Sequence, residues 1–234
     1  MPLEYARISA RDLENVALKG DVIAVIPLGS VEQHCEGPLG LDSMVAERLA
    51  YEACRRLEEE GRATCLILPT IHYGYSPEWS RVRGTISLPL HVYAKLLEEV
   101  IEGVVRGGVK RVVLLNAHGG NAGVAEAILR GLASKHEGLV LALVNYWELL
   151  NVRLDHGGPV EEAVARALGL EVDFGNCVDV GYESRPRVIL GSPREPSRVV
   201  LEGAVPPLGP EALIGALAKA LRKIASESPL KHSI

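Results

Sequence analysis

The chain has 234 residues, of which 47% are hydrophobic, so it can bury a sizeable core and is not a disordered chain. Its formal net charge of -5 does not attract polyanions in bulk, so we expect no nucleic-acid partner. No basic start followed by an apolar run marks a secretory leader, and no stretch approaches the roughly 20 apolar residues that span a bilayer. The four cysteines show no CxxC spacing, which is typical of reduced thiols in a cytoplasmic protein; a Cys54–Cys65 bridge is allowed but not required.

The first half of the chain alternates between strand and helix patterns. Residues 21–28 are an apolar, β-branched run ending in Gly-Ser, which is typical of a buried strand. Residues 43–60 follow with helical spacing of apolar positions, and Gly61 provides a stop. Residues 65–71 predict a second strand, and Pro69 predicts that this strand bends or frays towards its end.

The second half continues this alternation after an irregular segment at 72–90. The patterns predict a helix at 91–106, a strand at 110–115, a helix at 122–135, a strand at 139–145, and helices at 159–168 and 210–225. The less regular region 171–210 predicts a small hairpin or an oligomer contact. Alternating strands and helices imply parallel strands with helices on both faces, and the absence of a linker or repeat predicts one domain over residues 1–234.

Polar residues gather where the predicted strands end, which is where ligands bind in a parallel α/β sheet. These residues are Glu32, His34 and Asp42 after the first strand, His72, Tyr73, Ser76 and Glu78 after the second, Asn116, His118 and Asn121 after the third, and Asp155, His156, Glu161 and Glu162 after the fourth. Histidine and carboxylate together suit zinc, manganese or iron. Two histidines with three carboxylates are enough for a paired metal site with a hydroxide between the ions.

Each residue also has a simpler interpretation. Glu32 alone could be a solvated carboxylate, and His34 alone could be a hydrogen-bonded structural histidine. Asp42 or Ser43 could be the N-cap of the helix that follows. The pair Gly119-Gly120 could form a phosphate-binding turn, although no dinucleotide or Walker motif accompanies it. The metal-site interpretation is favoured because the fold brings all these residues to one edge of the sheet.

Four segments, in order along the chain, resemble the creatininase (creatinine amidohydrolase) family. The segment 27–34, Pro-Leu-Gly-Ser-Val-Glu-Gln-His, is similar to that family's Gly-Ser-x-Glu-Gln-His signature. The segment 73–79, followed by 83–88, is similar to its Tyr-Gly-x-Ser-x-Glu-His and Pro-Gly-Thr segments. The third is Asn-Ala-His-Gly-Gly-Asn at 116–121, and the fourth is His-Gly-Gly-Pro-Val-Glu-Glu at 156–162.

The resemblance implies a three-layer α/β/α fold, two divalent metal ions (zinc or manganese, with iron also compatible with the ligands), and hexamers built from dimers. It implies hydrolysis of carbon–nitrogen bonds that are not ordinary peptides. The metal-ligand positions that it implies are Glu32, His34, Asp42, His118 and Glu161, with Asp42 bridging. His156 maps onto a proton-shuttling position, and we expect Glu78 or Trp79 to shape the pocket wall, with Glu78 as the second candidate catalytic residue.

The chain departs from the family pattern at several positions. The loop from His34 to Asp42 is one residue shorter and lacks a second histidine, and Cys35 stands where glycine is usual. Trp79 replaces a histidine, and Arg83 replaces a proline. Creatinine hydrolases have a glutamate ligand at the position of Gly120, so the resemblance assigns that contact to Glu161, and creatinine is not the default substrate.

Three hypotheses follow. The first is a metal-dependent amidohydrolase whose metal-bridging hydroxide attacks a cyclic amide or formamide, with deformylation of a formamidopyrimidine nucleotide as one variant. The second is a redirected, non-catalytic relative that acts in binding or assembly because the shortened loop has removed the second metal site. The third is a nucleotide- or phosphate-binding enzyme that uses residues 116–121 as an anion loop. Under the first hypothesis we expect the binding partner to be a small-molecule amide substrate. We also expect a homo-oligomer and a cytoplasmic location.

Overall fold

The computed structural model describes residues 1–19, 22–150, 155–175 and 209–227. Its strands are β1 (Leu3–Glu4), β2 (Val22–Leu28), β3 (Thr64–Ile67), β4 (Arg111–Asn116) and β5 (Val140–Asn145). Its helices are α1 (Ala10–Ala17), α2 (Leu41–Glu59), α3 (Leu90–Arg106), α4 (Asn121–Lys135), α5 (Tyr146–Leu149), α6 (Pro159–Ala167) and α7 (Pro210–Ser226), with short 3₁₀ turns η1 (Tyr5–Arg7) and η2 (Pro77–Trp79). The four predicted strands and five predicted longer helices are all present.

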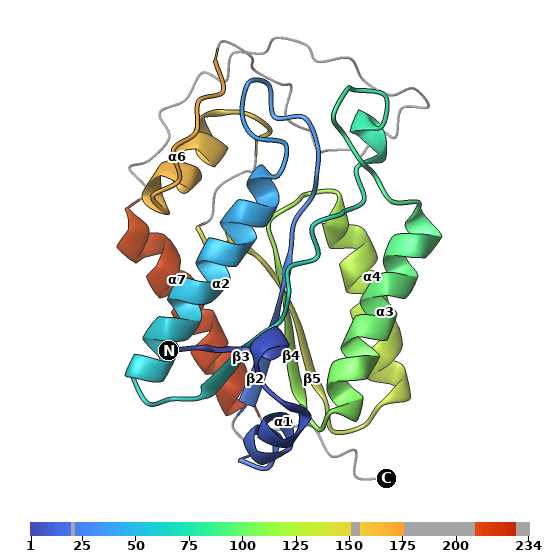
Figure 1. The fold of residues 1–234 in the computed structure, drawn as a ribbon, viewed down its shortest axis with the longest axis vertical. Coiled ribbons are helices and arrows are strands. Elements are labelled where there is room, and N and C mark those ends of the chain that lie inside the picture. The colour runs from blue at the N-terminus through green and yellow to red at the C-terminus, as the bar shows by residue number, and fades with distance from the viewer. Residues whose placement is uncertain (20–21, 151–154, 176–208, 228–234) are drawn as a thin grey trace.

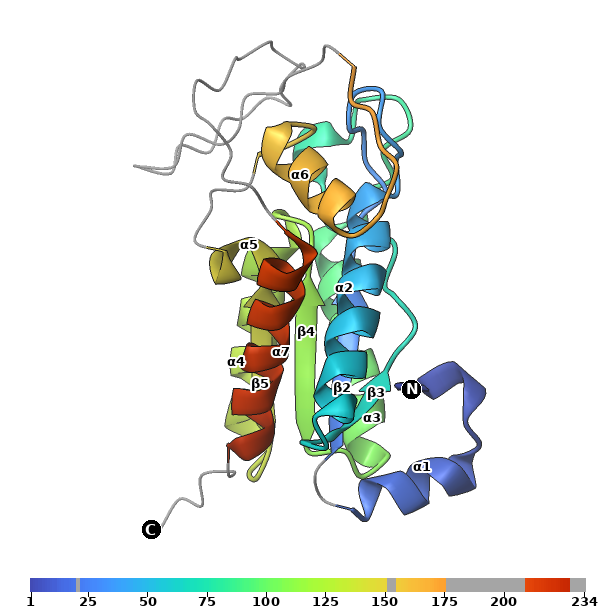
Figure 2. The same cartoon turned by 90° about the vertical axis from the view of Figure 1, so that its left-hand side faces the viewer.

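The sheet has five parallel strands in the order β1-β3-β2-β4-β5. Every residue of the central strand β2 is buried, as its continuous apolar sequence predicts for a strand covered on both faces. α2, α6 and α7 cover one face and α3 and α4 the other, as Figures 1 and 2 show. The predicted three-layer α/β/α fold is therefore confirmed.

Two apolar cores hold the layers together. On one face, Leu49 and Leu57 of α2 pack with Leu217 of α7 against the sheet. On the other face, Leu97 of α3 and Leu129 of α4 belong to the second core. Side chains alternate along each strand, so β2 contributes Ile23 and Val25 to the first core and Ala24 and Ile26 to the second.

The connections create a crevice at the centre of the sheet. α2 leads from β2 to β3 on one face, and α3 leads from β3 to β4 on the other face. In the sheet, β3 lies on one side of β2 and β4 on the other. The chain therefore runs from β2 towards one edge of the sheet and from β4 towards the opposite edge. The carboxyl ends of β2 and β4 therefore form a topological switch point, which is the usual place for a ligand in such a fold.

Some elements differ from the sequence predictions. The short β1, α1 and α5 were not predicted, because two to eight residues give too little periodicity; α1 nevertheless has a capping box between Ser9 and Asp12. α2 begins at Leu41 with Gly40 as its N-cap, so the interpretation of Asp42 as an N-cap is wrong. The predicted hairpin or contact at 171–210 lies mostly outside the described residues.

The cysteines only partly follow the prediction of reduced thiols. Cys54 and Cys65 are buried and free, so the allowed bridge between them is absent. Cys35, in contrast, is disulfide-bonded, which corrects the expectation for that residue. Cys35 also has a φ of 60°, a left-handed conformation that glycine adopts most easily, which gives a physical reason for the glycine usual at this position in the family pattern.

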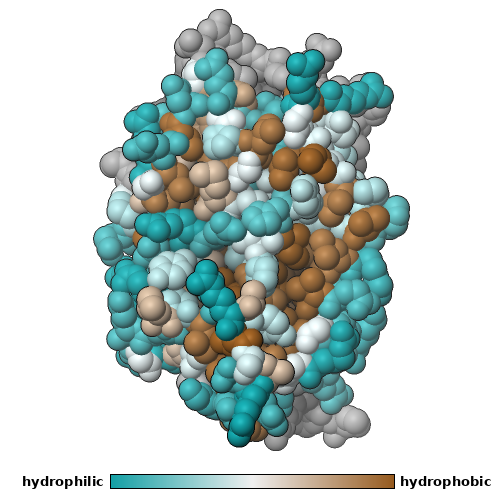
Figure 3. Space-filling view, in the orientation of Figure 1, coloured by the Kyte–Doolittle hydropathy of each residue, from teal (hydrophilic) through white to brown (hydrophobic). Residues whose placement is uncertain are grey.

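The face shown in Figure 3 has a continuous apolar area over α3. The α3 side chains Leu90, Val92 and Leu96 are 52%, 41% and 36% exposed, although the opposite side of the same helix is buried in the core. Among the described residues, no helix is both long enough and apolar enough to cross a membrane.

Candidate metal centre

Two loops and two helix starts converge on the crevice at the ends of β2 and β4. The loop after β2 carries Glu32 and His34, and the first turn of α2 carries Asp42. The loop after β4 carries His118, and the first turn of α6 carries Glu161. These five side chains are 0–4% exposed. The structure thus brings together the predicted ligand residues, and the shortened loop does not move Asp42 away from them.

The ligand atoms lie at the spacing expected around metal ions. His118 Nδ1 is 3.1 Å from Glu32 Oε1 and 3.1 Å from Asp42 Oδ2. His34 Nε2 is 3.4 Å from Asp42 Oδ1 and 3.8 Å from Glu161 Oε2. Two ligands of a tetrahedral zinc ion, each about 2.0–2.1 Å from it, are about 3.3–3.4 Å apart. The residues therefore form two triads, Glu32–Asp42–His118 and His34–Asp42–Glu161, which share Asp42.

Each of the two histidines is oriented by a main-chain carbonyl. Nδ1 of His34 lies 3.0 Å from the carbonyl oxygen of Glu32, and Nε2 of His118 lies 3.1 Å from that of Tyr75. A carbonyl oxygen only accepts, so these nitrogens carry protons, and the other ring nitrogen of each histidine presents a lone pair only when that ring is neutral, as it is on a metal ion. This is the arrangement by which metal-binding histidines are held in one tautomer.

Within the part of the chain that the structure describes, two buried atoms of the cluster have no hydrogen-bond partner, namely Glu32 Oε2 and His34 Nε2. Leaving buried polar atoms unsatisfied is costly, and metal coordination is one way to satisfy them. The hydroxyl of Ser30 donates to Asp42 Oδ2 at 2.8 Å, which fixes the shared carboxylate. Unpartnered atoms, ligand types and spacing together fit a pair of divalent ions.

In the metal-free cluster, closely spaced carboxylates concentrate negative charge and shift the pKa values of the neighbouring groups. Burial opposes ionisation of Asp42, but His34 and His118 outweigh it and hold the pKa of Asp42 well below its ordinary value. Burial works against a charged His34, yet Asp42 and Glu161 raise its pKa to about 10. Burial also raises the pKa of Glu161 to about 8. Protons on histidine therefore balance the carboxylates when metal is absent.

A buried amide network fixes the loop that carries His118. Asn116 Oδ1 accepts the backbone N–H of His118, and its amide donates to the His118 carbonyl and to Asn145. Asn121 donates to the Gly29 carbonyl at 3.0 Å and accepts the N–H of Tyr75 at 3.0 Å. The network thus ties the exits of β2 and β4 to the segment before η2.

His156 and the η2 turn lie over the cluster. The His156 ring stacks on Trp79 (centroids 4.6 Å apart, planes 15° apart) and contacts His34 on its other side at 4.5 Å. Nδ1 of His156 is 3.4 Å from Glu32 Oε1. Burial lowers the pKa of His156 to about 4 and raises that of Glu78, whose charge also interacts with His118.

Comparison with known proteins identifies the family. A family model described as creatinine amidohydrolase matches residues 6–172. The chain belongs to the creatininase family. It is 24% identical over 196 residues to creatinine amidohydrolase of Pseudomonas putida, covering 72% of this chain and 73% of that enzyme. It is 38% identical over 104 residues to the mycofactocin precursor peptide peptidase of Mycobacterium tuberculosis, covering 42% of this chain and 41% of that protein. Solved manganese and Zn–Zn forms of creatininase share the fold, with TM-scores of 0.74 and 0.75 over 97% of this chain and 100% of theirs, at 20% identity.

The structure gives a physical reason for the glycine at position 120 and shows how Glu161 reaches the cluster. A Cβ at Gly120 would overlap the carbonyl oxygen of Tyr75 and stand 2.6 Å from His118 Nε2. No side chain fits at position 120 without moving the metal-site loop. Glu161 instead approaches from α6, where Asp155 accepts its backbone N–H at 3.0 Å and its own carboxylate accepts the N–H of Gly157 at 2.7 Å.

Not every polar residue predicted at the strand ends faces the centre. His72 is exposed and lies 3.7 Å from Glu47, and Tyr73 is 48% exposed. Glu162 pairs with Arg166 on the outer side of α6. Ser30 and Asn145 were missed, although Asn145 ends a strand and the same rule would have found it.

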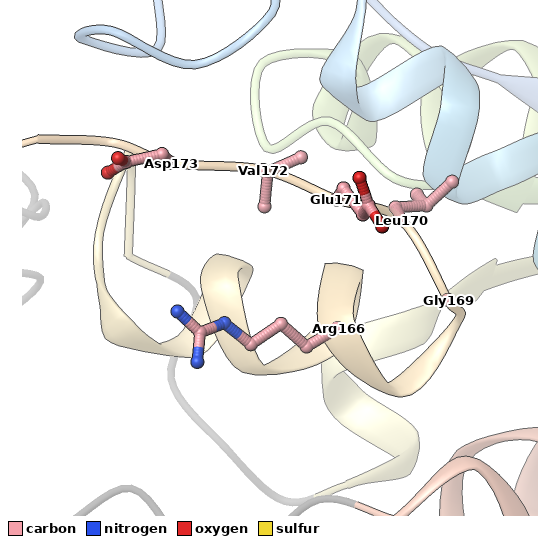
Figure 4. A pocket seen from close by; sticks show the side chains of 6 residues that line it. All are labelled: Arg166, Gly169, Leu170, Glu171, Val172 and Asp173. Atoms are coloured by element: carbon pink, nitrogen blue, oxygen red, sulfur yellow. The ribbon is translucent and has the colours of Figure 1, made fainter.

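The pocket in Figure 4 is separate from this centre. It lies between α6 and the segment after it, where Arg166 of α6 faces the stretch that carries Val172 and Asp173. None of the five clustered ligand residues lines it. We therefore assign it no part in the chemistry of the centre.

Proposed function

We propose that this chain is a metal-dependent amidohydrolase that cleaves a carbon–nitrogen bond in a cyclic amide or formamide. The observation that carries the proposal is the pair of triads that share Asp42, with two buried ligand atoms left without a partner. Membership of a family of hydrolases supports the same conclusion. Glu32, Asp42 and His118 would hold one ion, and His34, Asp42 and Glu161 would hold the other.

Divalent ions bound there would supply Lewis-acid activation of water and of the scissile carbonyl. The chain's own residues supply position and proton transfer. Ser30 fixes Asp42, and main-chain carbonyls fix His34 and His118, so the ligands are placed before substrate arrives. Almost complete burial of the cluster excludes bulk water, which strengthens the electrostatic effect of the site on a developing oxyanion.

His156 is the proposed proton carrier. The lowered pKa of His156, caused mainly by burial, keeps its ring neutral at pH 7, so Nδ1 can take a proton from the attacking water and pass it to the leaving nitrogen. Stacking on Trp79 holds the ring over the cluster. Glu78, whose pKa burial raises, lies beside this route and is the proposed second group that contacts the substrate.

Replacing the shared carboxylate tests the proposal. Asp42→Asn keeps the shape but removes the charge that both triads use, so we expect the purified protein to lose both equivalents of zinc or manganese and its amidase activity to fall at least about a thousandfold. Asp173→Asn is the control, because this exposed aspartate only accepts the N–H of Gly175, which asparagine also can do. Elemental analysis and a screen of cyclic amides and formamides are the measurements. Wild-type protein without metal after reconstitution would refute the proposal.

One observation favours a second substrate class. The identity to the mycofactocin precursor peptide peptidase, 38%, is higher than the 24% to creatinine amidohydrolase, although over a shorter segment. Water activated at this site could attack a peptide carbonyl as well as a cyclic amide, so the screen includes short peptides. Turnover of peptides alone would replace the small amide as substrate and leave the metal chemistry unchanged.

The hypotheses of a non-catalytic relative and of a phosphate-binding loop predict other results. The first predicts one ion or none and no activity that depends on Asp42. The second predicts that phosphate compounds raise the melting temperature of metal-free protein. Assembly into homo-oligomers and a cytoplasmic location also stay predictions, which size measurement and fractionation would test.

A further inference from the structure

His156 shares the features that mark His34 and His118 as ligands. Its Nε2 lies 2.6 Å from the main-chain carbonyl oxygen of Gln33, a group that can only accept, so Nε2 carries the proton. The side-chain amide nitrogen of Gln33 is 3.0 Å from the same ring nitrogen and would suit the opposite tautomer. The shorter contact with the obligate acceptor decides the assignment. Nδ1 therefore presents a lone pair, as the inward nitrogens of the other two histidines do.

That lone pair is aimed at the first triad. Nδ1 of His156 is 3.4 Å from Glu32 Oε1, which is the spacing of two ligands on one zinc ion, about 3.3–3.4 Å. Its ligand atom also lies within 4.8 Å of those of Glu32 and His34, so the three residues form a third potential metal-binding group. Stacking between Trp79 and His34 limits how the ring can turn.

Resting on the metal centre proposed above, we propose that His156 is a fourth, displaceable protein ligand of the ion held by Glu32, Asp42 and His118. A catalytic zinc site keeps one position open beside three protein ligands, whereas a structural site is closed by four. Nδ1 of His156 would then close the resting site to water and small anions. On displacement by substrate, this nitrogen would be released as the base next to the reacting atoms. The ligand and proton-carrier roles are thus successive states of one side chain.

This state makes the site selective for substrates that compete with an imidazole. A weak ligand such as water would not displace Nδ1 of His156. The oxygen of an amide that the protein also holds by other contacts would displace it. Glu32 and Asp42 are only 1% and 3% exposed, whereas the side chain of His156 is 13% exposed, so His156 is the more accessible member of the group.

The test uses the full chain loaded with cobalt(II), whose visible spectrum reports the number and type of ligands. In wild type we expect two equivalents to bind and azide to change the spectrum only at high concentration. In His156→Ala we expect one equivalent to bind at least about ten-fold more weakly, and azide to bind at least about ten-fold more tightly because a position is open. His136→Ala is the matched control, since His136 pairs with Glu102 on the surface. His156→Asn, which keeps a polar side chain, replaces the alanine variant if circular dichroism shows that the latter is unfolded.

The outcomes separate this inference from the proposed function. Equal azide affinity in wild type and in the His156 variant overturns the inference, even if cobalt affinity falls, because His156 would then only orient Glu32. Wild type that binds no cobalt overturns the proposed function and the inference with it. Two tightly bound equivalents in every variant, with unchanged spectra, overturn the inference alone.

Discussion

Gly120 provides a direct test of how tightly the centre is built. In Gly120→Ala the new Cβ would overlap the Tyr75 carbonyl and stand 2.6 Å from His118 Nε2, and both neighbours are held by hydrogen bonds. Gly120 has φ -63° and ψ -27°, so alanine suits the backbone and only the contact is changed. Overpacking of this kind costs about 1–3 kcal/mol, which for a chain of this size lowers the melting temperature by roughly 2–12 °C. Because His118 must move, we also expect metal affinity to fall about 10–100-fold.

Gly123→Ala is the matched control three residues along the same segment. Gly123 lies inside α4, and a Cβ there would meet nothing within 4 Å. This change should stabilise the protein by about 0.5–1 kcal/mol through helix propensity and leave metal binding as it is. Thermal unfolding, with and without zinc, and competitive metal titration measure both effects. If Gly120→Ala binds metal as wild type does and melts no lower, the close packing around His118 has been misjudged and Glu161 is not required by lack of space at 120.

Two further predictions concern pH and the amide network. Metal-free protein should lose stability as pH rises from 6 to 9, because the folded-state pKa values of His34 (about 10) and Glu161 (about 8) lie above their ordinary values, and stability from a raised pKa is lost as pH rises towards it. Zinc-loaded protein should show the reverse trend in metal affinity, since binding needs deprotonated ligands; equal melting curves at both pH values without metal would contradict this reasoning. Asn121→Ala should destabilise the fold by at least about 2 kcal/mol, because it leaves the Tyr75 N–H and Gly29 carbonyl buried without partners. Urea unfolding measures that loss.

The sequence was sufficient for the fold because its strands are long and continuously apolar. The apolar runs 21–28 and 110–115 predict strands at the buried centre of a parallel sheet, and β2 and β4 lie there. The two-residue β1 and the four-residue α5 have no comparable signal, because they form only where the rest of the fold offers a neighbour. Strand and helix propensities summed over so few residues are too small to predict these elements.

The sequence predicted which residues lie at the candidate site better than it predicted where their side chains point. The ends of parallel strands share one edge, so the sequence alone predicts that Glu32, His34 and His118 lie together. The same rule also selected His72, which points to solvent, because the edge of a sheet has an outside as well as a crevice. The main-chain carbonyls that fix each histidine tautomer have no sequence signature at all. Only the path of the backbone at Tyr75 reveals that contact.

The same five side chains could in principle be an ion-pair network that serves stability alone. In such a network each buried charge finds a partner, because an unpaired buried charge costs several kcal/mol. Here the charges do find partners, since His34 Nε2 is 3.4 Å from Asp42 Oδ1 and Glu32 Oε1 is 3.1 Å from His118 Nδ1, but among the described residues His34 Nε2 and Glu32 Oε2 have no hydrogen-bond partner. His34 and His118 also each place one ring nitrogen against a main-chain carbonyl, so the other nitrogen faces the carboxylates and becomes a lone pair aimed at a metal ion once its proton is lost. An ion-pair network gains nothing by leaving two buried ligand atoms without a hydrogen bond, whereas a metal ion would satisfy both. Metal binding therefore accounts for these two atoms, and ion pairing alone does not.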